Sequence, residues 1–400
     1  MDSFVYHLPT KVYFGPDQLE HLGLEAAEYG KSVLLCYGKG SIKETGLYDR
    51  IKQSLEKAGL NVVELAGIEP NPKIESVREG VKLCKEHEVD CVIAAGGGSV
   101  IDCAKIICAG ACTEADPWDF FSKKTPITHA LPLIDVLTLA ATGSEMNNCA
   151  VISNTETREK MGAASPVLIP KVSFMDPALS MSVPPYQTAS GSADIFNHIL
   201  EDYFSREENL FMLSRSMEGL MKTVIHYAPI AMKEPQNYEA RANLMWASSW
   251  AINGFNRGAN PKTWSMHPID HQLTAFYGIT HGHGLAIITP RYLSYVKNQK
   301  TLPRLAEYGI NVWNIDPSLP DDQIANLAIE KTADFLFRDL GLTDNLKDLG
   351  VKEEDLPEMA RRSCKNDVIH GFVDLTPGDV EVIYQACMEP YNRPSSEAAV

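Results

Sequence analysis

The chain has 400 residues, of which 44% are hydrophobic, so it is long enough for a large buried core and for two domains. Its 36 basic and 52 acidic side chains give a formal net charge of −16, which argues against binding to nucleic acids or anionic membranes. Any bound phosphate must therefore be held by backbone amides or by a few well-placed Lys and Ser side chains.

The nine cysteines are scattered and include no Cys-x-x-Cys pair, which argues against a disulfide framework and a thiolate zinc site. The opening residues, MDSFVYHLPT, lack the basic and apolar regions of a secretory signal. The most apolar run, 92–111, is interrupted by Gly96–Gly98, Asp102 and Lys105, which argues against a membrane-spanning helix there. These features lead us to expect a cytoplasmic protein of a reducing compartment.

Strand-like and helix-like segments alternate over the first 180 residues. Apolar strands are predicted at 32–37, 61–65, 90–95 and 133–139, and helices at 42–57, 74–88 and 99–112. Short, nearly continuous apolar strands separated by helices are typical of a parallel sheet that is covered on both faces. The sequence thus predicts an α/β domain over residues 1–180.

The pattern changes after about residue 184, where no comparable β-branched runs occur. Helical periodicity is found in the segments 188–204, 208–228, 238–256, 264–277, 284–297 and 321–340, with Pro and Gly between them. We therefore predict an all-α domain over residues 181–400, with the domain boundary near residue 180.

Three polar, glycine-containing clusters follow predicted strands, and two of them follow the third and fourth strands. Gly96-Gly97-Gly98-Ser99 lies between a strand and a helix, where a parallel sheet offers free amides and a helix N-terminus to a pyrophosphate. This string is neither G-x-G-x-x-G nor a P-loop, so an ordinary turn with Ser99 as the N-cap is the alternative. Thr138 and the run 141–145 (ATGSE) could contact phosphates or a nicotinamide amide, although an ordinary polar turn fits equally well.

A third cluster, Gly38-Lys39-Gly40-Ser41, follows the first predicted strand. Sheets that bind NAD often carry an acidic residue near this point, which binds the adenosine ribose hydroxyls. Between Gly38 and Lys43 there is no Asp or Glu, whereas Lys39, Ser41 and Lys43 could bind a 2′-phosphate. The charge pattern favours NADP(H) over NAD(H).

Asp194 and His198 are four residues apart on a predicted helix, so they share one face with their Cβ atoms about 5–6 Å apart. Such a pair could bind a cation or form a structural hydrogen bond. Four more histidines lie within 17 residues of one another: His267, His271, His281 and His283. One carboxylate and several imidazoles suit Fe(II) or Zn(II), but residue chemistry leaves open which histidines are the ligands.

Together these patterns resemble the iron-containing, or group III, alcohol dehydrogenase family, especially its bacterial NADPH-dependent butanol dehydrogenases and broad-range aldehyde reductases. The matching segments are 96–105 (GGGS with Asp102 and Lys105), 139–145 with Lys160, 176–201, and His267-Pro268-x-x-His271 with His281-Gly282. The resemblance covers nearly the whole chain. It implies the dehydroquinate synthase-like fold of the family, in which a Rossmann-like dinucleotide-binding domain precedes a helical metal-binding domain and the active site lies between them.

The resemblance also implies roles for individual residues. The metal ligands are expected to be Asp194, His198, His267 and His281. The expected cofactor-binding residues are Gly38, Lys39, Ser41, Asn71, Gly97, Gly98, Ser99, Asp102, Thr138, Thr142, Ser144 and Lys160. His271 is the candidate proton relay and Asp102 a second catalytic candidate. His283 is expected not to bind the metal, and His370 is a candidate for the mouth of the site.

The expected activity is reversible hydride transfer between NADP(H) and a small, butanol-like primary alcohol or its aldehyde, with an Fe(II) or Zn(II) ion and a homodimeric enzyme. An apolar substrate pocket is expected from Trp264, Met266, Phe255, Met146 and Asn147. Three alternatives remain: an NAD(H)-preferring polyol or lactaldehyde dehydrogenase, a dehydroquinate synthase-like lyase, and a non-enzymatic binding protein. The lyase would need a basic cluster for its anionic substrate, and residues 180–290 show little sign of one.

Overall fold

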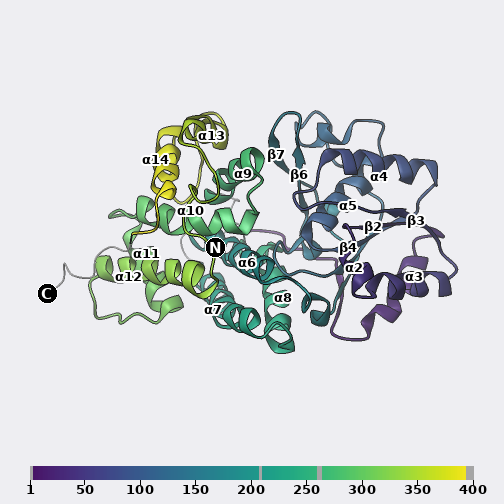
Figure 1. Ribbon diagram of the computed structural model, residues 1–400, viewed down its shortest axis with the longest axis horizontal. Helices are drawn as coiled ribbons and strands as arrows, with labels where there is room; N and C mark the ends of the chain where they lie inside the picture. The colour runs from purple at the N-terminus through teal and green to yellow at the C-terminus, as the bar shows by residue number, and fades with distance from the viewer. Residues whose placement is uncertain (1–2, 207–209, 259–263, 393–400) are drawn as a thin grey trace. The chain divides into compact units, whose positions relative to one another are not determined.

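The computed structural model describes residues 3–206, 210–258 and 264–392. The chain forms two compact units (Figure 1). One, the α/β unit, consists of Tyr6–Pro184 and Glu234–Asn253. The other, the helical unit, contains Pro185–Lys233 and Gly254–Val400 together with the first few residues. None of the described helices is both long and apolar enough to cross a membrane.

A six-stranded, fully parallel sheet forms the centre of the α/β unit, in the order β1-β8-β5-β4-β2-β3. Its strands are β1 (Lys11–Phe14), β2 (Ser32–Tyr37), β3 (Asn61–Leu65), β4 (Cys91–Gly96), β5 (Leu133–Leu137) and β8 (Val172–Met175). The predicted parallel sheet is confirmed, and its four predicted strands are present to within about two residues. The two strands of only four residues, β1 and β8, were not predicted.

Helices cover both faces of this sheet, which explains why the central strands β2, β4 and β5 are buried along almost their whole length. Val92 and Ala94 of β4 pack in a core with α4 (Ile74–Glu86) and α5 (Gly98–Gly110). The alternate residues Cys91 and Ile93 pack in a second core with α1 (Leu22–Ala27) and α3 (Leu47–Lys57). Figure 1 shows α3 and α4 on opposite sides of the strands.

The chain order of the strands reverses between β2 and β4. From β2 the chain moves outward to β3 and then returns to β4, on the other side of β2. Tyr37 and Ala95 are in register, so the loops after these two strands leave the same edge of the sheet side by side. In open parallel sheets, this reversal point is where ligands bind.

The predicted helix 42–57 is two helices, α2 (Ser41–Glu44) and α3, separated by Gly46 in a left-handed conformation with φ of 74°. An antiparallel hairpin of β6 (Cys149–Asn154) and β7 (Glu159–Ala164), which was not predicted, follows the short helix η3 (Ser144–Met146). Three further single turns, η2 (Pro117–Phe120), η4 (Pro166–Leu168) and η5 (Pro177–Ser180), lie in loops of this unit, and η1 (Gln18–His21) precedes α1.

The helix α8 (Tyr238–Ile252) groups with the α/β unit, although the boundary near residue 180 assigned it to the helical domain. Its Ser248 hydroxyl accepts a hydrogen bond from the Gly143 amide at 3.2 Å, and its Ser249 hydroxyl donates to Glu145 at 2.5 Å. The chain thus leaves the α/β unit near residue 184 and returns to it once.

The described part of the helical unit contains no strand longer than an isolated bridge. Its helices are α6 (Pro185–Tyr203), α7 (Phe211–Lys233), α9 (Met266–Tyr277), α10 (His281–Val296), α11 (Leu302–Trp313), α12 (Asp321–Ala333), the π-helix η6 (Asp334–Asp339), η7 (Glu353–Asp355), α13 (Leu356–Ser363) and α14 (Pro377–Met388). Helix α6 is central, because it packs against α7 and α10 and is buried from Thr188 to Tyr203.

Candidate metal centre and phosphate-binding edge

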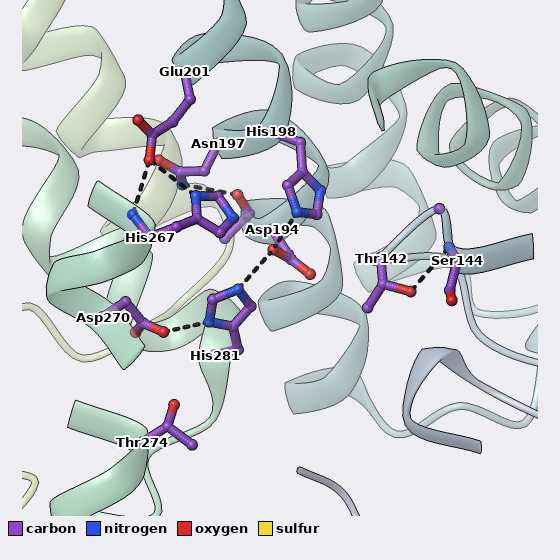
Figure 2. A network of polar contacts seen from close by, with 12 residues as sticks. Thr142, Ser144, Asp194, Asn197, His198, Glu201, His267, Asp270, Thr274 and His281 are labelled. Atoms are coloured by element: carbon purple, nitrogen blue, oxygen red, sulfur yellow. Dashed lines mark hydrogen bonds and ion pairs between the residues drawn. The ribbon is translucent and has the colours of Figure 1, made fainter. Parts of the chain in front are cut away.

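Three helices of the helical unit bring four side chains to one point (Figure 2). Asp194 and His198 lie one turn apart on the buried part of α6, His267 is on the first turn of α9, and His281 begins α10. One ligand atom from each of the four lies within 4.8 Å of the others. Asp194 Oδ1 is 3.5 Å from His198 Nε2 and 3.7 Å from His281 Nε2.

The chemistry of this cluster fits a divalent ion. Asp194, His198 and His267 are all at most 5% exposed, and burying a carboxylate is costly unless a cation or hydrogen bonds compensate for its lost hydration. One carboxylate and three imidazoles are the donors that iron and zinc accept in proteins. The side chain of His281 is 21% exposed, so the cluster is reached from one side.

The other histidines have different surroundings. The buried His283 accepts from the Tyr186 hydroxyl at Nδ1 and donates from Nε2 to the Thr343 carbonyl, both at 3.0 Å, so both ring nitrogens are engaged away from the cluster. Burial lowers the pKa of His283. The ring of His271 lies 5.6 Å from that of His281, centroid to centroid. His370 is exposed and pairs with Asp374 at 2.8 Å.

Two buried carboxylates without a predicted role adjoin the cluster. Glu201 accepts from the backbone amides of Ser265 and His267, at 2.6 and 2.8 Å, and lies 2.9 Å from His267 Nδ1. Burial raises the pKa of Glu201 to about 8, although these backbone hydrogen bonds oppose the rise. Asp270, which is fully buried, contacts His281 Nδ1. In the sequence, the only signal is spacing: Glu201 and Asp270 each lie three residues after a candidate ligand.

Among the expected pocket residues, Trp264 lies against two of the four clustered side chains. Its ring centroid is 4.3 Å from that of His267 and 5.4 Å from that of His198, and its indole N–H donates to Asp202 at 2.7 Å. Asn147 has another role, because its side-chain oxygen accepts from the buried ammonium of Lys105 at 2.8 Å within the α/β unit.

The N-terminus of α5 lies at the reversal point of the sheet. Gly97 is the N-cap and the helix begins at Gly98, so the alternative of Ser99 as the N-cap is wrong. A Cβ at Gly98 would lie 2.1 Å from the Thr142 hydroxyl, which explains the glycine there. The first amides of a helix have no partner within it, and the N-terminus of this 13-residue helix is therefore suited to an anion.

Asp102 holds the polar loop that faces this helix end. Its carboxylate accepts from the Ser144 hydroxyl at 2.5 Å and from the Val151 amide at 2.8 Å. Thr142 accepts from the Ser144 amide at 3.2 Å (Figure 2), and the Thr138 amide donates to the Gly96 carbonyl at 3.0 Å. These contacts make Asp102 an anchor of the loop, while its predicted catalytic role stays a prediction.

Charged side chains come from the loops that follow β2 and β3. Lys39 pairs with Glu69 at 2.6 Å, and Lys73 pairs with the other oxygen of Glu69 at 2.7 Å. These two ammonium groups lower the pKa of Glu69 to about 2. An acidic residue thus stands beside Lys39 after all. It comes from the neighbouring strand's loop, which inspection of residues 38–44 could not reveal.

Two other expected cofactor-binding residues contact each other here, because Lys160 Nζ lies 3.1 Å from Asn71 Oδ1. Lys43, by contrast, lies over the rings of Tyr37 and Tyr48, at 5.2 and 4.7 Å from their centroids. Ser41 is exposed at the start of α2. The sheet edge therefore gathers basic, hydroxyl and amide groups from five different segments of the chain.

Comparison with known proteins gives consistent matches over this whole architecture. The model of the iron-containing alcohol dehydrogenases matches residues 9–177, and that of the C-terminal part of the Fe-containing alcohol dehydrogenase family matches residues 188–388. NADH-dependent butanol dehydrogenase B of Clostridium acetobutylicum is 47% identical over 91% of this chain and 94% of its own length. The NADPH-dependent aldehyde reductase YqhD of Escherichia coli is 37% identical, over 94% and 95%.

A solved structure agrees with the fold over almost its entire length. The crystal structure of NADH-dependent butanol dehydrogenase A from Thermotoga maritima superposes with a TM-score of 0.93 at 36% sequence identity. The match covers 97% of this chain and 99% of that one.

Proposed function

The chain belongs to the iron-containing alcohol dehydrogenase family, and we propose that it is a metal-dependent enzyme that interconverts small primary alcohols and aldehydes by hydride transfer with a nicotinamide coenzyme. The cluster of Asp194, His198, His267 and His281 carries this proposal. Three of these four side chains are buried, and burying a carboxylate beside imidazoles is costly unless a bound cation compensates for the lost hydration.

A divalent ion bound to these four side chains would supply Lewis-acid polarisation of the substrate oxygen. Asp194 contributes the one negative charge of the set, and the imidazoles bind in their neutral form. The indole of Trp264, which lies against His198 and His267, provides an apolar wall beside them. A small aliphatic alcohol or aldehyde suits such surroundings.

We assign the proton transfer to His271. It is half-buried on α9, one turn from His267, and its ring lies 5.6 Å from that of His281. The ring therefore lies beside the ligand cluster, although His271 is not one of the four candidate ligands. A histidine titrates near neutral pH, so it can accept the proton of an alcohol and return it to an aldehyde.

The α/β unit is proposed to bind the coenzyme. The amides of Gly97, Gly98 and Ser99 would hold the pyrophosphate at the N-terminus of α5. The loop after β5, which Asp102 anchors, contains Thr138, Thr142 and Ser144. The two compact units would thus correspond to coenzyme-binding and metal-binding domains, with α8 in the former.

We propose NADP(H) as the preferred coenzyme, because residues 38–43 offer two lysines and a serine and no acidic group. NAD(H) is the competing assignment, which two observations favour. The relative from C. acetobutylicum is named NADH-dependent, and Glu69 neutralises Lys39 here. Comparing kcat/KM for NADPH and NADH decides between them, and a clear preference for NADH ends the NADP(H) assignment.

Oxidation of NADPH or NADH with butanal tests the proposed activity, with turnover measured before chelation, after it, and after Fe(II) or Zn(II) is restored. We expect activity to fall on chelation and to return with the metal. No turnover in any metal form would contradict the dehydrogenase assignment. The choice between iron and zinc, the homodimer and the cytoplasmic location remain predictions.

The ligand set has its own test, which does not depend on finding the right substrate. Asp194→Ala and His281→Ala should lose bound metal, whereas His283→Ala should keep it, because both ring nitrogens of His283 are engaged elsewhere. Metal content per chain, measured on the purified proteins, gives the answer. Loss of metal in His283→Ala with an intact fold would require a different ligand set.

A further inference from the structure

Each of two ligand histidines meets a buried carboxylate on the side of its ring that faces away from the cluster. Glu201 Oε1 lies 2.9 Å from His267 Nδ1, and Asp270 contacts His281 Nδ1 (Figure 2). Glu201 is 4% exposed and Asp270 is fully buried. Neither residue is among the four that could bind the ion.

The contact with Asp270 determines which nitrogen of His281 would face a bound ion. A carboxylate accepts hydrogen bonds, so the imidazole nitrogen beside it carries the proton, and the other nitrogen keeps its lone pair. For His281 the remaining nitrogen is Nε2, which lies 3.7 Å from Asp194 Oδ1. Such a carboxylate also makes the imidazole a stronger base and fixes the plane of its ring.

The position of Asp270 depends on Gly284, one turn into α10. A Cβ on Gly284 would lie 1.9 Å from Asp270 Oδ1 and 3.3 Å from Leu273 Cδ1. No side chain fits there while the carboxylate keeps its place. Gly284 has no unusual backbone conformation to explain it, since it lies inside a regular helix. The close approach of the Asp270 carboxylate therefore explains the glycine at this position.

Gly282 plays a parallel part on the other face of α10, where a Cβ would lie 1.9 Å from the Ser190 carbonyl of α6. The alternation His281-Gly282-His283-Gly284 therefore has a packing explanation. One glycine lets α10 approach the helix that carries Asp194, and the other admits the carboxylate that holds His281.

We propose that Asp270, seated in the space that Gly284 leaves open, is a positioning residue that sets the tautomer and orientation of His281 for metal binding. The inference rests on the proposed metal site and extends it beyond the four ligands. Asp270 acts through His281 and has no contact with the substrate in this assignment.

The test measures Zn²⁺ affinity by competition with a chromogenic chelator, and folding by circular dichroism and thermal unfolding. Asp270→Asn should weaken Zn²⁺ binding by about 10- to 100-fold, the usual effect of losing such a partner. Glu218→Gln is the matched control, because Glu218 is a buried carboxylate on α7 that accepts from Tyr203 and Arg215. It should bind Zn²⁺ as the wild type does.

A double-mutant cycle separates positioning from general damage. Gly284→Ala should weaken Zn²⁺ binding in the wild-type background but have little further effect in Asp270→Ala, because the carboxylate it displaces is already gone. Gly219→Ala on α7, where a Cβ would meet nothing within 4 Å, is its control. Multiplicative effects of Asp270→Ala and Gly284→Ala would overturn the inference, as would unchanged affinity in Asp270→Asn.

Two further measurements keep the answer unambiguous. If Asp270→Asn fails to fold, ¹⁵N-histidine NMR of the Zn²⁺-loaded wild type still reports the tautomer. A proton on Nδ1 of His281 supports the inference and a proton on Nε2 refutes it. If Asp194→Ala binds Zn²⁺ as tightly as the wild type, the proposed metal site itself is wrong. If Asp194→Ala loses Zn²⁺ while Asp270→Asn keeps it fully, only the positioning role fails.

Discussion

In the proposed function, the chemistry of the helical unit depends on Asp194. Its carboxylate is 3% exposed, and its Oδ1 lies 3.5 and 3.7 Å from the Nε2 atoms of His198 and His281. A bound cation replaces the hydration that burial removes from such a group. Two further side chains, His271 and Glu69, give testable predictions at the scale of single residues.

Replacing His271 with Gln should lower kcat and flatten its dependence on pH, while metal content stays at the wild-type level. Glutamine keeps hydrogen-bonding capacity and loses the ability to accept a proton near neutral pH. Steady-state rates from pH 6 to 9, with metal analysis of the same samples, measure both effects. His370→Gln is the control, since His370 is exposed and paired with Asp374. A pH profile that keeps its shape in His271→Gln would remove His271 from the proton pathway.

Replacing Glu69 with Gln should raise the ratio of kcat/KM for NADPH to that for NADH. The change frees Lys39 to meet a 2′-phosphate and removes a nearby negative charge. Both partners of this ion pair are solvent-exposed, so screening by water should keep the shift to a few-fold at most. Glu75→Gln, an exposed change on α4, should leave the ratio alone. An unchanged ratio in Glu69→Gln would mean that Glu69 does not influence the 2′-position.

What the sequence predicts at this scale depends on how local the signal is. Helical spacing alone suggests Asp194 and His198 as a pair, but it does not separate a metal site from a structural hydrogen bond. His267 and His281 needed the family resemblance, because four histidines lay close together in the chain and spacing could not choose between them. The sequence does not predict Asp270 or Glu69, because their proposed roles depend on contacts between segments. These contacts form where α9 meets α10 and where the β3 loop meets the β2 loop.

At the scale of elements, apolar runs were reliable guides where both faces of a strand are buried. β2, β4 and β5 were predicted for this reason, whereas the four-residue β1 and β8 were too short to stand out. The hairpin β6–β7 has mixed exposure and few β-branched residues, so its sequence resembles a loop. Helix α8 was predicted as a helix, but its unit was not, because that depends on Ser248 and Ser249 meeting the 143–145 loop.

The central strand β5 carries a buried acid whose removal should stabilise the fold. Asp135 is fully buried, its carboxylate accepts from Ser173 at 2.6 Å, and burial raises its pKa well above the usual range. The folded state therefore holds this proton more tightly than the unfolded chain does. As pH rises above about 4, the unfolded chain releases the proton first, and the free energy of unfolding falls until the folded group ionises.

Asp135→Asn should accordingly be more stable than the wild type at pH 8, with the difference shrinking toward pH 4. Denaturant unfolding at several pH values measures it. Asp90→Asn should behave in the opposite way, because the Ser32 and Lys31 amides lower the pKa of Asp90 and its stabilising effect is lost only in acid. A pH-independent difference between Asp135→Asn and the wild type would show that Asp135 ionises alike in both states.

For the whole molecule, the two proposed binding sites lie in different compact units. The proposed phosphate-binding residues belong to the α/β unit, and the four candidate metal ligands belong to the helical unit. A ligand that binds only the folded state stabilises it in proportion to the logarithm of its concentration over Kd, by about 2.7 kcal/mol at 100 times Kd. Each ligand should therefore stabilise the fold through its own unit.

Two variants make this separation measurable in thermal unfolding. Asp194→Ala should lose the increase in Tm that Zn²⁺ gives and keep the increase from NADPH. Gly98→Ala should show the reverse, because its Cβ would push against the Thr142 hydroxyl, 2.1 Å away, and disturb the helix end that is proposed to hold the pyrophosphate. Gly219→Ala should keep both increases, since its Cβ meets nothing. If Asp194→Ala also abolished the effect of NADPH, the two binding sites would not be energetically independent, and coenzyme binding would require the metal to be in place.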